Sequence, residues 1–251
     1  MKSLQELNSL ALRTRRLLGE DSYSPIDIFA LVNGWKEKKI TIVRYPFSNR
    51  ISGMCTCINN DFIIGINSKS SYGRQRFTLA HELYHIVYER NTDRIISDMS
   101  MVDTKSDSEK EADWFASYLL MPYDALLAYD EKAEEWNLER VIEAEQFFPI
   151  SHMAMVFRLK QDGKITADEA SVFQSCSVSR KAASLGFGKE LYIPLQVAKQ
   201  YFTTGEYIRK VEQLSEKDLI SNGKREELLL DAFRADIVYN LDEEEGFHLN
   251  D

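Results

Sequence analysis

The sequence contains little cysteine and histidine: three cysteines and four histidines occur in 251 residues. Three cysteines cannot build a disulfide framework, because an odd number leaves one of them unpaired. No stretch approaches the roughly 18 consecutive apolar residues that are needed to cross a bilayer. Residues 1–20 mix charged side chains with leucines at helical spacing, which is not the pattern of a signal peptide. We therefore expect a soluble, cytoplasmic protein with no membrane-spanning segment.

The sequence also has no excess of basic residues. Lys and Arg number 31 against 40 Asp and Glu, a net charge of −9. Basic and acidic residues number 16 and 17 in residues 1–130, 6 and 9 in residues 131–180, and 9 and 14 in residues 181–251. A protein that binds nucleic acid mainly through phosphates normally has a basic surface. The composition therefore disfavours direct DNA binding, and it leaves nucleic acid open only as an activating partner.

The remaining composition is that of a globular protein, with 44% hydrophobic and 28% charged residues. Three β-branched segments precede a long region with helical periodicity; these segments are Lys39–Tyr45, Ile51–Ile58 and Asp61–Ile66. We expect an α+β fold in three parts. Residues 1–130 would hold a small β-sheet, residues 131–180 a helical module, and residues 181–251 a helical C-terminal region with helices around Pro194–Phe202, Glu206–Leu214 and Gly223–Tyr239.

The middle part resembles a helix-turn-helix. Residues 138–147 and 151–161 have helical periodicity and are separated by Pro149-Ile150, with Ser151 as the N-cap of the second helix. The exposed side of this second helix is expected to present His152, Arg158 and Lys160. Glutamates crowd the first helix, however, so a packing or partner-docking role is favoured over DNA reading.

The strongest chemical signal is His81-Glu82-Leu83-Tyr84-His85. Two histidines four residues apart lie on one face of a helix and can hold a single metal ion. Glu82 projects about 100° from His81 around the helix axis, where a carboxylate can accept a proton from a metal-bound water. Zn²⁺ suits two imidazoles and a carboxylate with an open fourth position. The alternative, two unrelated histidines on a surface helix, is disfavoured because the helix is apolar on its other side.

A third protein ligand is needed, and a carboxylate of the segment Ser108–Leu120 is the candidate. Glu109 and Glu111 flank the apolar stripe of this segment on opposite sides, so spacing alone does not choose between them. Each also fits the S-x-x-E capping box, with Ser106 or Ser108 as the N-cap, and that role needs no metal.

The sequence around these residues resembles the ImmA/IrrE metallopeptidases, and the resemblance covers roughly residues 24–165. The resemblance rests on the blocks Arg76–His85, Glu111–Ala116 and Leu119–Pro122, which read RFTLAHELYH, EADWFA and LLMP. It implies a zincin-like catalytic domain in residues 1–130, with His81, His85 and Glu111 as zinc ligands and Glu82 as the general base. Asp113 stands where the family commonly has asparagine, which could alter hydrogen bonding around the metal ligands.

The resemblance also implies a function. Family members are zinc endopeptidases that cleave a regulatory protein, typically a helix-turn-helix repressor of a mobile-element, phage, stress or anti-phage defence operon. One alternative is a non-proteolytic regulator that binds a repressor or DNA, and another is a toxin–antitoxin component. Intact His81, Glu82, His85 and Glu111 favour the enzyme.

Two further expectations concern the segment Ile51–Ile58. Metallopeptidases of this type often hold an extended substrate on an edge strand, and this segment is the candidate. Cys55 and Cys57 share one face of it, so one thiolate could occupy the open zinc position and inhibit the enzyme. Burial of small residues that behave as hydrophobes is the favoured alternative.

Overall fold

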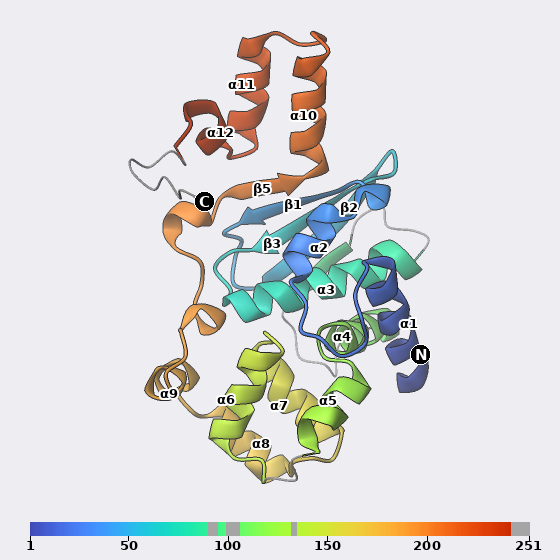
Figure 1. Ribbon diagram of the computed structural model, residues 1–251, viewed down its shortest axis with the longest axis vertical. Helices are drawn as coiled ribbons and strands as arrows, with labels where there is room; N and C mark the ends of the chain where they lie inside the picture. Colours follow the sequence, from blue (N-terminus) through green and yellow to red (C-terminus); the bar gives the residue numbers. More distant parts are fainter. Residues whose placement is uncertain (90–94, 99–105, 132–134, 242–251) are drawn as a thin grey trace, which may run out of the picture.

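A five-stranded sheet lies at the centre of the molecule, as the computed structural model shows (Figure 1). The structure describes residues 1–89, 95–98, 106–131 and 135–241. The strands are β1 (Ile40–Tyr45), β2 (Ile51–Ile58), β3 (Asp61–Asn67), β4 (Ile95–Asp98) and β5 (Phe202–Gly205), in the order β4-β2-β3-β1-β5. β1 and β3 run parallel, whereas the other neighbouring strands are antiparallel. The predicted α+β class and the first three predicted strands are confirmed.

Helices make up most of the described chain. They are α1 (Leu4–Leu17), α2 (Ile28–Gly34), α3 (Tyr72–Tyr88), α4 (Asp107–Leu120), α5 (Tyr123–Asp130), α6 (Leu138–Phe147), α7 (His152–Gln161), α8 (Ala167–Gln174), α9 (Val178–Ser184), α10 (Glu206–Glu216), α11 (Asn222–Asp231) and α12 (Ala235–Tyr239). Short 3-10 turns cover Lys36–Lys38, Glu190–Tyr192 and Val197–Lys199. None of the helices in the described ranges has the length and apolar character that a bilayer crossing requires.

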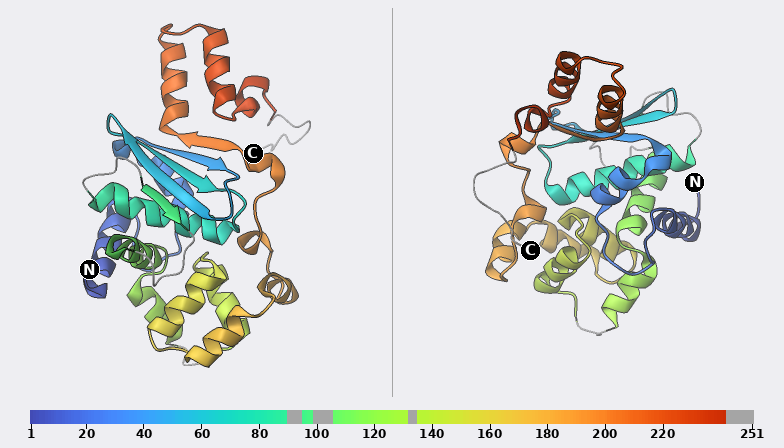
Figure 2. Two further views of the ribbon diagram at one scale, coloured as in Figure 1. Left: turned by 180° about the vertical axis from the view of Figure 1, so that it is seen from behind. Right: turned by 45° about the horizontal axis from the view of Figure 1, so that its top comes forward.

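Helix α3 is the central helix, and it packs between the sheet and α4. Its apolar residues Leu79 and Leu83 are fully buried, as are Ile64 and Ile66 of β3. On the other side of α3 lie α4 and then α1, which packs against α4. Figure 2 shows the same layering from behind, with α3 crossing one face of the sheet. A helix enclosed in this way holds its side chains in fixed positions, as a binding site requires.

Strand β2 is not the edge strand that the sequence suggested. β3 pairs with one side of β2 over Gly53–Ile58, and β4 pairs with the other side over Ile51–Cys55. Its backbone groups are thus used by two neighbours, which leaves no row of donors and acceptors for a substrate. β4 ends the strand order on this side of the sheet instead. The sequence pattern missed β4 because this strand has only four residues.

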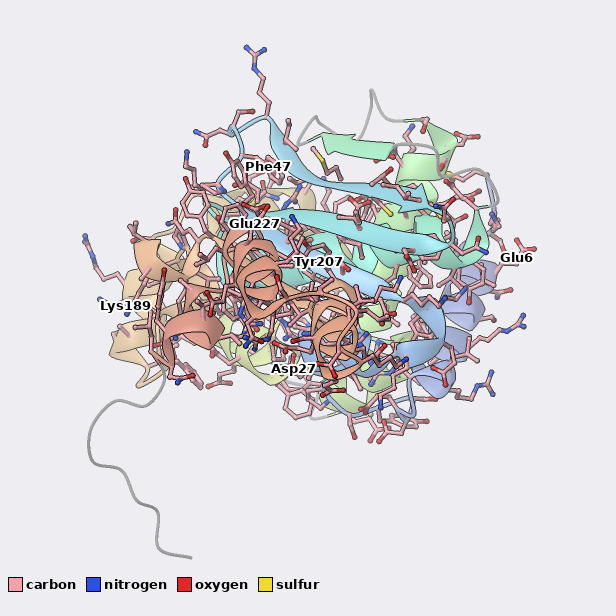
Figure 3. All side chains as sticks on the ribbon, turned by 90° about the horizontal axis from the view of Figure 1, so that it is seen from above. Glu6, Asp27, Phe47, Lys189, Tyr207 and Glu227 are labelled. Atoms are coloured by element: carbon pink, nitrogen blue, oxygen red, sulfur yellow. The ribbon has the colours of Figure 1, made fainter. Side chains whose placement is uncertain are left out.

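The C-terminal region is not purely helical. The expected helix at Pro194–Phe202 is replaced by a 3-10 turn, Val197–Lys199, and by β5, which pairs antiparallel with β1. Helix α10 then rises from the sheet, anchored by the backbone N–H of Tyr207, which donates to the hydroxyl of Thr41 at 3.0 Å. Figure 3 looks down on this helix from above and shows Tyr207 lying over the strands. Residues from the far end of the chain therefore complete the sheet.

Gly205 makes this junction possible. Its φ of +94° lies in a region that L side chains rarely adopt, and an added Cβ would lie 2.2 Å from the carbonyl oxygen of Ile40. We expect Gly205→Ala to lower the free energy of unfolding by about 1–3 kcal/mol, measured by chemical denaturation. The matched control is Gly223→Ala on α11, where no atom lies within 4 Å. Equal stability of the two variants would contradict the prediction.

The two helices of the expected helix-turn-helix are present as α6 and α7, but their exposed face differs from the prediction. Arg158 is fully buried and donates to Asp162, the hydroxyl of Ser117 and the carbonyl of Met121. His152 is only 9% exposed. Neither side chain can reach a DNA groove from these positions, because each is committed to the interior. Of the three candidate contact residues, Lys160 is the one exposed to solvent.

Candidate metal centre

Two buried imidazoles face each other on α3. The helix begins at the N-cap Ser71, whose hydroxyl accepts from the backbone N–H of Arg74, and it runs for 17 residues. Because His81 and His85 are four residues apart, they lie one turn apart on the same face. They are 3% and 0% exposed, and their Nε2 atoms are 3.3 Å apart. The structure thus brings the two histidines together on one face of α3.

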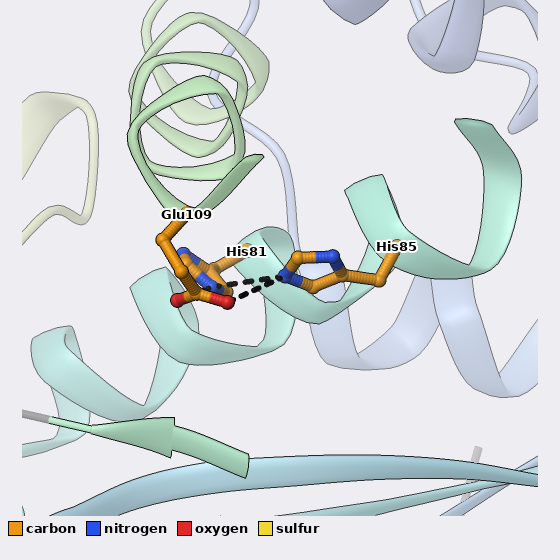
Figure 4. Close-up of side chains that lie close together, drawn as sticks. All are labelled: His81, His85 and Glu109. Atoms are coloured by element: carbon orange, nitrogen blue, oxygen red, sulfur yellow. Dashed lines mark hydrogen bonds and ion pairs between the residues drawn. The ribbon is translucent and has the colours of Figure 1, made fainter. Parts of the chain in front are cut away.

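The carboxylate that joins them comes from Glu109 in the first turn of α4. One oxygen of Glu109 lies 3.3 Å from Nε2 of His81, and the other lies 3.5 Å from Nε2 of His85 (Figure 4). Ser106 caps α4 by accepting from the backbone N–H of Glu109 at 3.3 Å. The Glu109 backbone therefore belongs to the cap, while its side chain turns towards the histidines.

A second pair of carboxylates orients the two rings. The Nδ1 atom of His81 lies 2.9 Å from Asp113, and the Nδ1 atom of His85 lies 2.8 Å from Glu89. Ser108 at the start of α4 donates its hydroxyl to Glu89. A carboxylate at Nδ1 holds the proton on that nitrogen, which leaves the Nε2 lone pair available as a ligand. Sequence reasoning missed Glu89, although its position four residues after His85 on the same helix was a usable signal.

The electrostatics of the two histidines differ. Burial lowers the pKa of His81, but hydrogen bonds to Asp113 and Glu109 outweigh it and raise the pKa to about 9. Burial, together with the charge of His81, lowers the pKa of His85. Without a cation between the rings, His81 therefore takes up a proton at a higher pH than His85 does.

This donor set fits a divalent cation. Two Nε2 lone pairs 3.3 Å apart and facing one carboxylate repel one another unless a proton or a cation lies between them. One potential ligand atom from each of His81, His85 and Glu109 lies within 4.8 Å of the others. Two imidazoles and one carboxylate form the three-ligand set typical of catalytic zinc sites, in which a fourth position stays open.

Glu111, the third ligand that the family resemblance implied, lies elsewhere. Its carboxylate accepts from the backbone N–H of Lys2 and the hydroxyl of Tyr84, and it lies 2.7 Å from Nζ of Lys2. The physical reason is helix geometry, since residues two apart on α4 point about 200° from each other. Glu109 and Asp113, four apart, share the face directed at the histidines. Burial would raise the pKa of Glu111, but Lys2 and Tyr84 lower it to about 2.

Glu82 lies beside the histidines on the side of the sheet. Its side chain is fully buried, and its charge contributes to the raised pKa of His81. An added Cβ at Gly53 of β2 would lie 3.2 Å from Oε1 of Glu82 and 2.5 Å from Cγ2 of Thr78. Glycine at position 53 therefore gives the Glu82 carboxylate its space against β2.

The remaining sequence candidates have packing roles. Cys55 is fully buried, and burial together with the charge of Glu82 raises the pKa of its thiol. Among the described residues, the group of potential ligands around the histidines contains no cysteine. Both features favour the hydrophobic role of Cys55 over a zinc-binding thiolate. Two tyrosines outside these candidates, Tyr84 and Tyr118, are also buried; the hydroxyl of Tyr84 donates to Glu111, and the ring of Tyr118 lies 4.2 Å from the guanidinium of Arg158.

Comparison with known protein families agrees with this geometry. Residues 36–160 match the family model described as the IrrE N-terminal-like domain of the M78 peptidases. The chain belongs to this family. The matched region contains β1 to β4 and α3 to α7, and thus every residue of the candidate metal centre. The family supports a metallopeptidase-type function. A comparison with curated proteins gives no match.

Proposed function

We propose that this member of the IrrE-like family is a zinc-dependent endopeptidase whose metal ligands are His81, His85 and Glu109. The observation that carries the proposal is the convergence of two buried Nε2 atoms and a carboxylate at one point, with Glu82 next to His81 on the same helix. A zinc ion held there supplies a Lewis acid that polarises the scissile carbonyl and makes a water molecule more acidic.

The side chains of the site then have distinct roles. Glu82 accepts a proton from the attacking water and later delivers it to the leaving amine, as a general base and then a general acid. Asp113 and Glu89 hold the imidazole rings in the orientation and tautomer that leave Nε2 unprotonated. Four carboxylates around two imidazoles also make the site negative, which favours a divalent cation over an anion.

The proposed substrate is a regulatory protein, specifically a helix-turn-helix repressor, which the family resemblance implies. Two features of this chain support a protein partner over direct DNA contact. The net charge of −9 opposes binding to a polyanion, and His152 and Arg158 of α7 are buried. An extended segment of the substrate would pair with the outer edge of β4, which ends the sheet next to β2.

The test is cleavage of the helix-turn-helix protein encoded beside this one. The two purified proteins are incubated with zinc, and the products are mapped by mass spectrometry. We expect cleavage at one peptide bond, loss of cleavage after chelation, and recovery when zinc is added back. Cleavage that persists at the same rate in the chelated protein would overturn the metal-dependent mechanism. An intact repressor under zinc-loaded conditions would overturn the proposed substrate.

A further inference from the structure

A cavity of about 460 Å³ opens at the start of α3, at the other end of the helix from His85. Three helix starts converge on it, those of α3, α7 and α9, and Leu191 and Tyr192 close one side. Five of its eleven lining residues are serines, one is Arg74, and none is acidic. The lining therefore supplies hydrogen-bond donors and one positive charge. Its volume lies in the range of pockets that hold small molecules.

Arg74 lines this cavity, and its guanidinium lies 5.9 Å from the ring centre of Phe77. Within the described ranges, no carboxylate lies at ion-pair distance from its guanidinium, and its Nε atom is enclosed with no hydrogen-bond partner. Burial lowers the pKa of the group, with the charge of Asp113 acting against that effect. An arginine nevertheless stays protonated in a protein, so a half-buried cation borders the cavity. Such a charge is costly unless an anion compensates it.

The other donors surround the same space. Ser177 and Ser179, at the start of α9, contribute hydroxyls, and the hydroxyl of the N-cap Ser177 makes no capping hydrogen bond. The start of α7 contributes the backbone N–H groups of His152 and Met153, since the N-cap Ser151 accepts from the N–H of Ala154. The first N–H groups of a helix have no partner within the helix and attract anions. Residues that carry side-chain, hydroxyl and backbone donors thus border one volume.

We propose that this cavity binds the phosphate group of a small phosphate monoester. A phosphate offers three oxygens that accept hydrogen bonds from several directions, whereas a carboxylate offers two oxygens in one plane. The donors here come from three separate helices, and the guanidinium of Arg74 matches two phosphate oxygens at once. The remaining volume, bordered by Leu191 and Tyr192, accommodates the organic part of the ligand. The cavity shares no lining residue with the ligand group of the metal centre.

The test is equilibrium binding to the full-length, metal-free protein, prepared with a chelator so that phosphate cannot bind to zinc. AMP and inorganic phosphate are the probes, adenosine is the neutral counterpart of AMP, and binding is followed by calorimetry and thermal shift. We expect AMP and phosphate to bind and to raise the melting temperature, and adenosine to do neither. Arg74→Gln should weaken AMP binding at least ~10-fold, since it removes charge-assisted hydrogen bonds.

The control is Arg50→Gln, which removes the same charge from an exposed position outside the cavity and should leave binding unchanged. The double variant Ser177→Ala, Ser179→Ala keeps Arg74 and tests the site even if Arg74→Gln folds poorly. We expect it to weaken AMP binding several-fold. Adenosine binding as tight as AMP binding, unchanged affinity in the serine variant, or no binding of phosphate to the metal-free protein would each overturn the proposal. Since the experiment uses no metal and no substrate, its outcome is separate from that of the proposed peptidase activity.

Discussion

Replacing Glu109 with glutamine is expected to lower the affinity for zinc by more than ~100-fold, because losses of 10–100-fold already follow when only a supporting partner of a ligand is removed. Glutamine has nearly the same shape but carries no negative charge, so the site keeps its packing and loses an anionic ligand. The same change at Glu111 should leave zinc affinity close to that of the wild type, since its carboxylate contacts Lys2 and Tyr84 instead. Zinc affinity is measured by a competition titration with a chromogenic chelator.

The two variants also differ in stability, which makes the pair a matched control. Glu111→Gln breaks an ion pair with Lys2 and weakens a buried hydrogen bond to Tyr84. We expect a loss of about 1 kcal/mol in the free energy of unfolding, because solvent screens the half-exposed Lys2. Glu109→Gln should leave the stability of the metal-free protein nearly unchanged when it is compared above pH 9, where His81 is neutral. The reverse pattern, zinc lost in the Glu111 variant and retained in the Glu109 variant, would restore the ligand set that the family resemblance implied.

The spacing of residues did not decide whether Glu109 or Glu111 is the third metal ligand. Spacing placed both on the flanks of one helix, and the resemblance selected Glu111 by its position in a motif. What the sequence could not supply was the rotation of α4 about its own axis relative to α3. This rotation is set by packing, because α4 buries Ala112, Phe115 and Leu119. Once these residues are buried, Glu109 and Asp113 face the histidines.

Local patterns predicted local structure well. The three β-branched segments became β1, β2 and β3, and the two histidines four residues apart met on one face of α3. Both signals depend only on neighbours along the chain. Long-range pairing was missed, since β5 is four residues long and gains its strand conformation from pairing with β1, some 160 residues away in sequence.

The error in the exposed face of α7 has a related cause. The polar side chains of His152, Arg158 and Lys160 predict an exposed helix face. In the structure, His152 and Arg158 are buried. The burial of Arg158 depends on acceptors from α4, from Met121 and from Asp162. Sequence alone indicates a charged residue but not the carbonyl and hydroxyl groups that satisfy it. The inference against DNA reading therefore has a firmer basis in the burial of these side chains than in net charge.

The change with the largest expected effect on activity is Glu82→Gln. If Glu82 transfers the proton between water and the leaving amine, its amide counterpart cannot do so, and the rate of repressor cleavage should fall by ~10²–10⁴-fold. Zinc content should not change, because Glu82 lies on the sheet side of α3 and outside the ligand group of His81, His85 and Glu109. Cleavage is measured as initial rates of product formation with zinc-loaded protein, and metal content is determined on the same samples.

The control is Glu143→Gln, the same chemical change at an exposed position of α6, which should cleave at the wild-type rate. Thermal unfolding of the Glu82 variant separates a chemical effect from a folding defect, because the side chain is fully buried. A Glu82→Gln protein that keeps its zinc and its stability yet loses cleavage assigns the proton transfer to this residue. A variant that cleaves as fast as the wild type would exclude that role. If the variant relieves repression in cells without cleaving the repressor, the chain acts by binding, as a non-proteolytic regulator would.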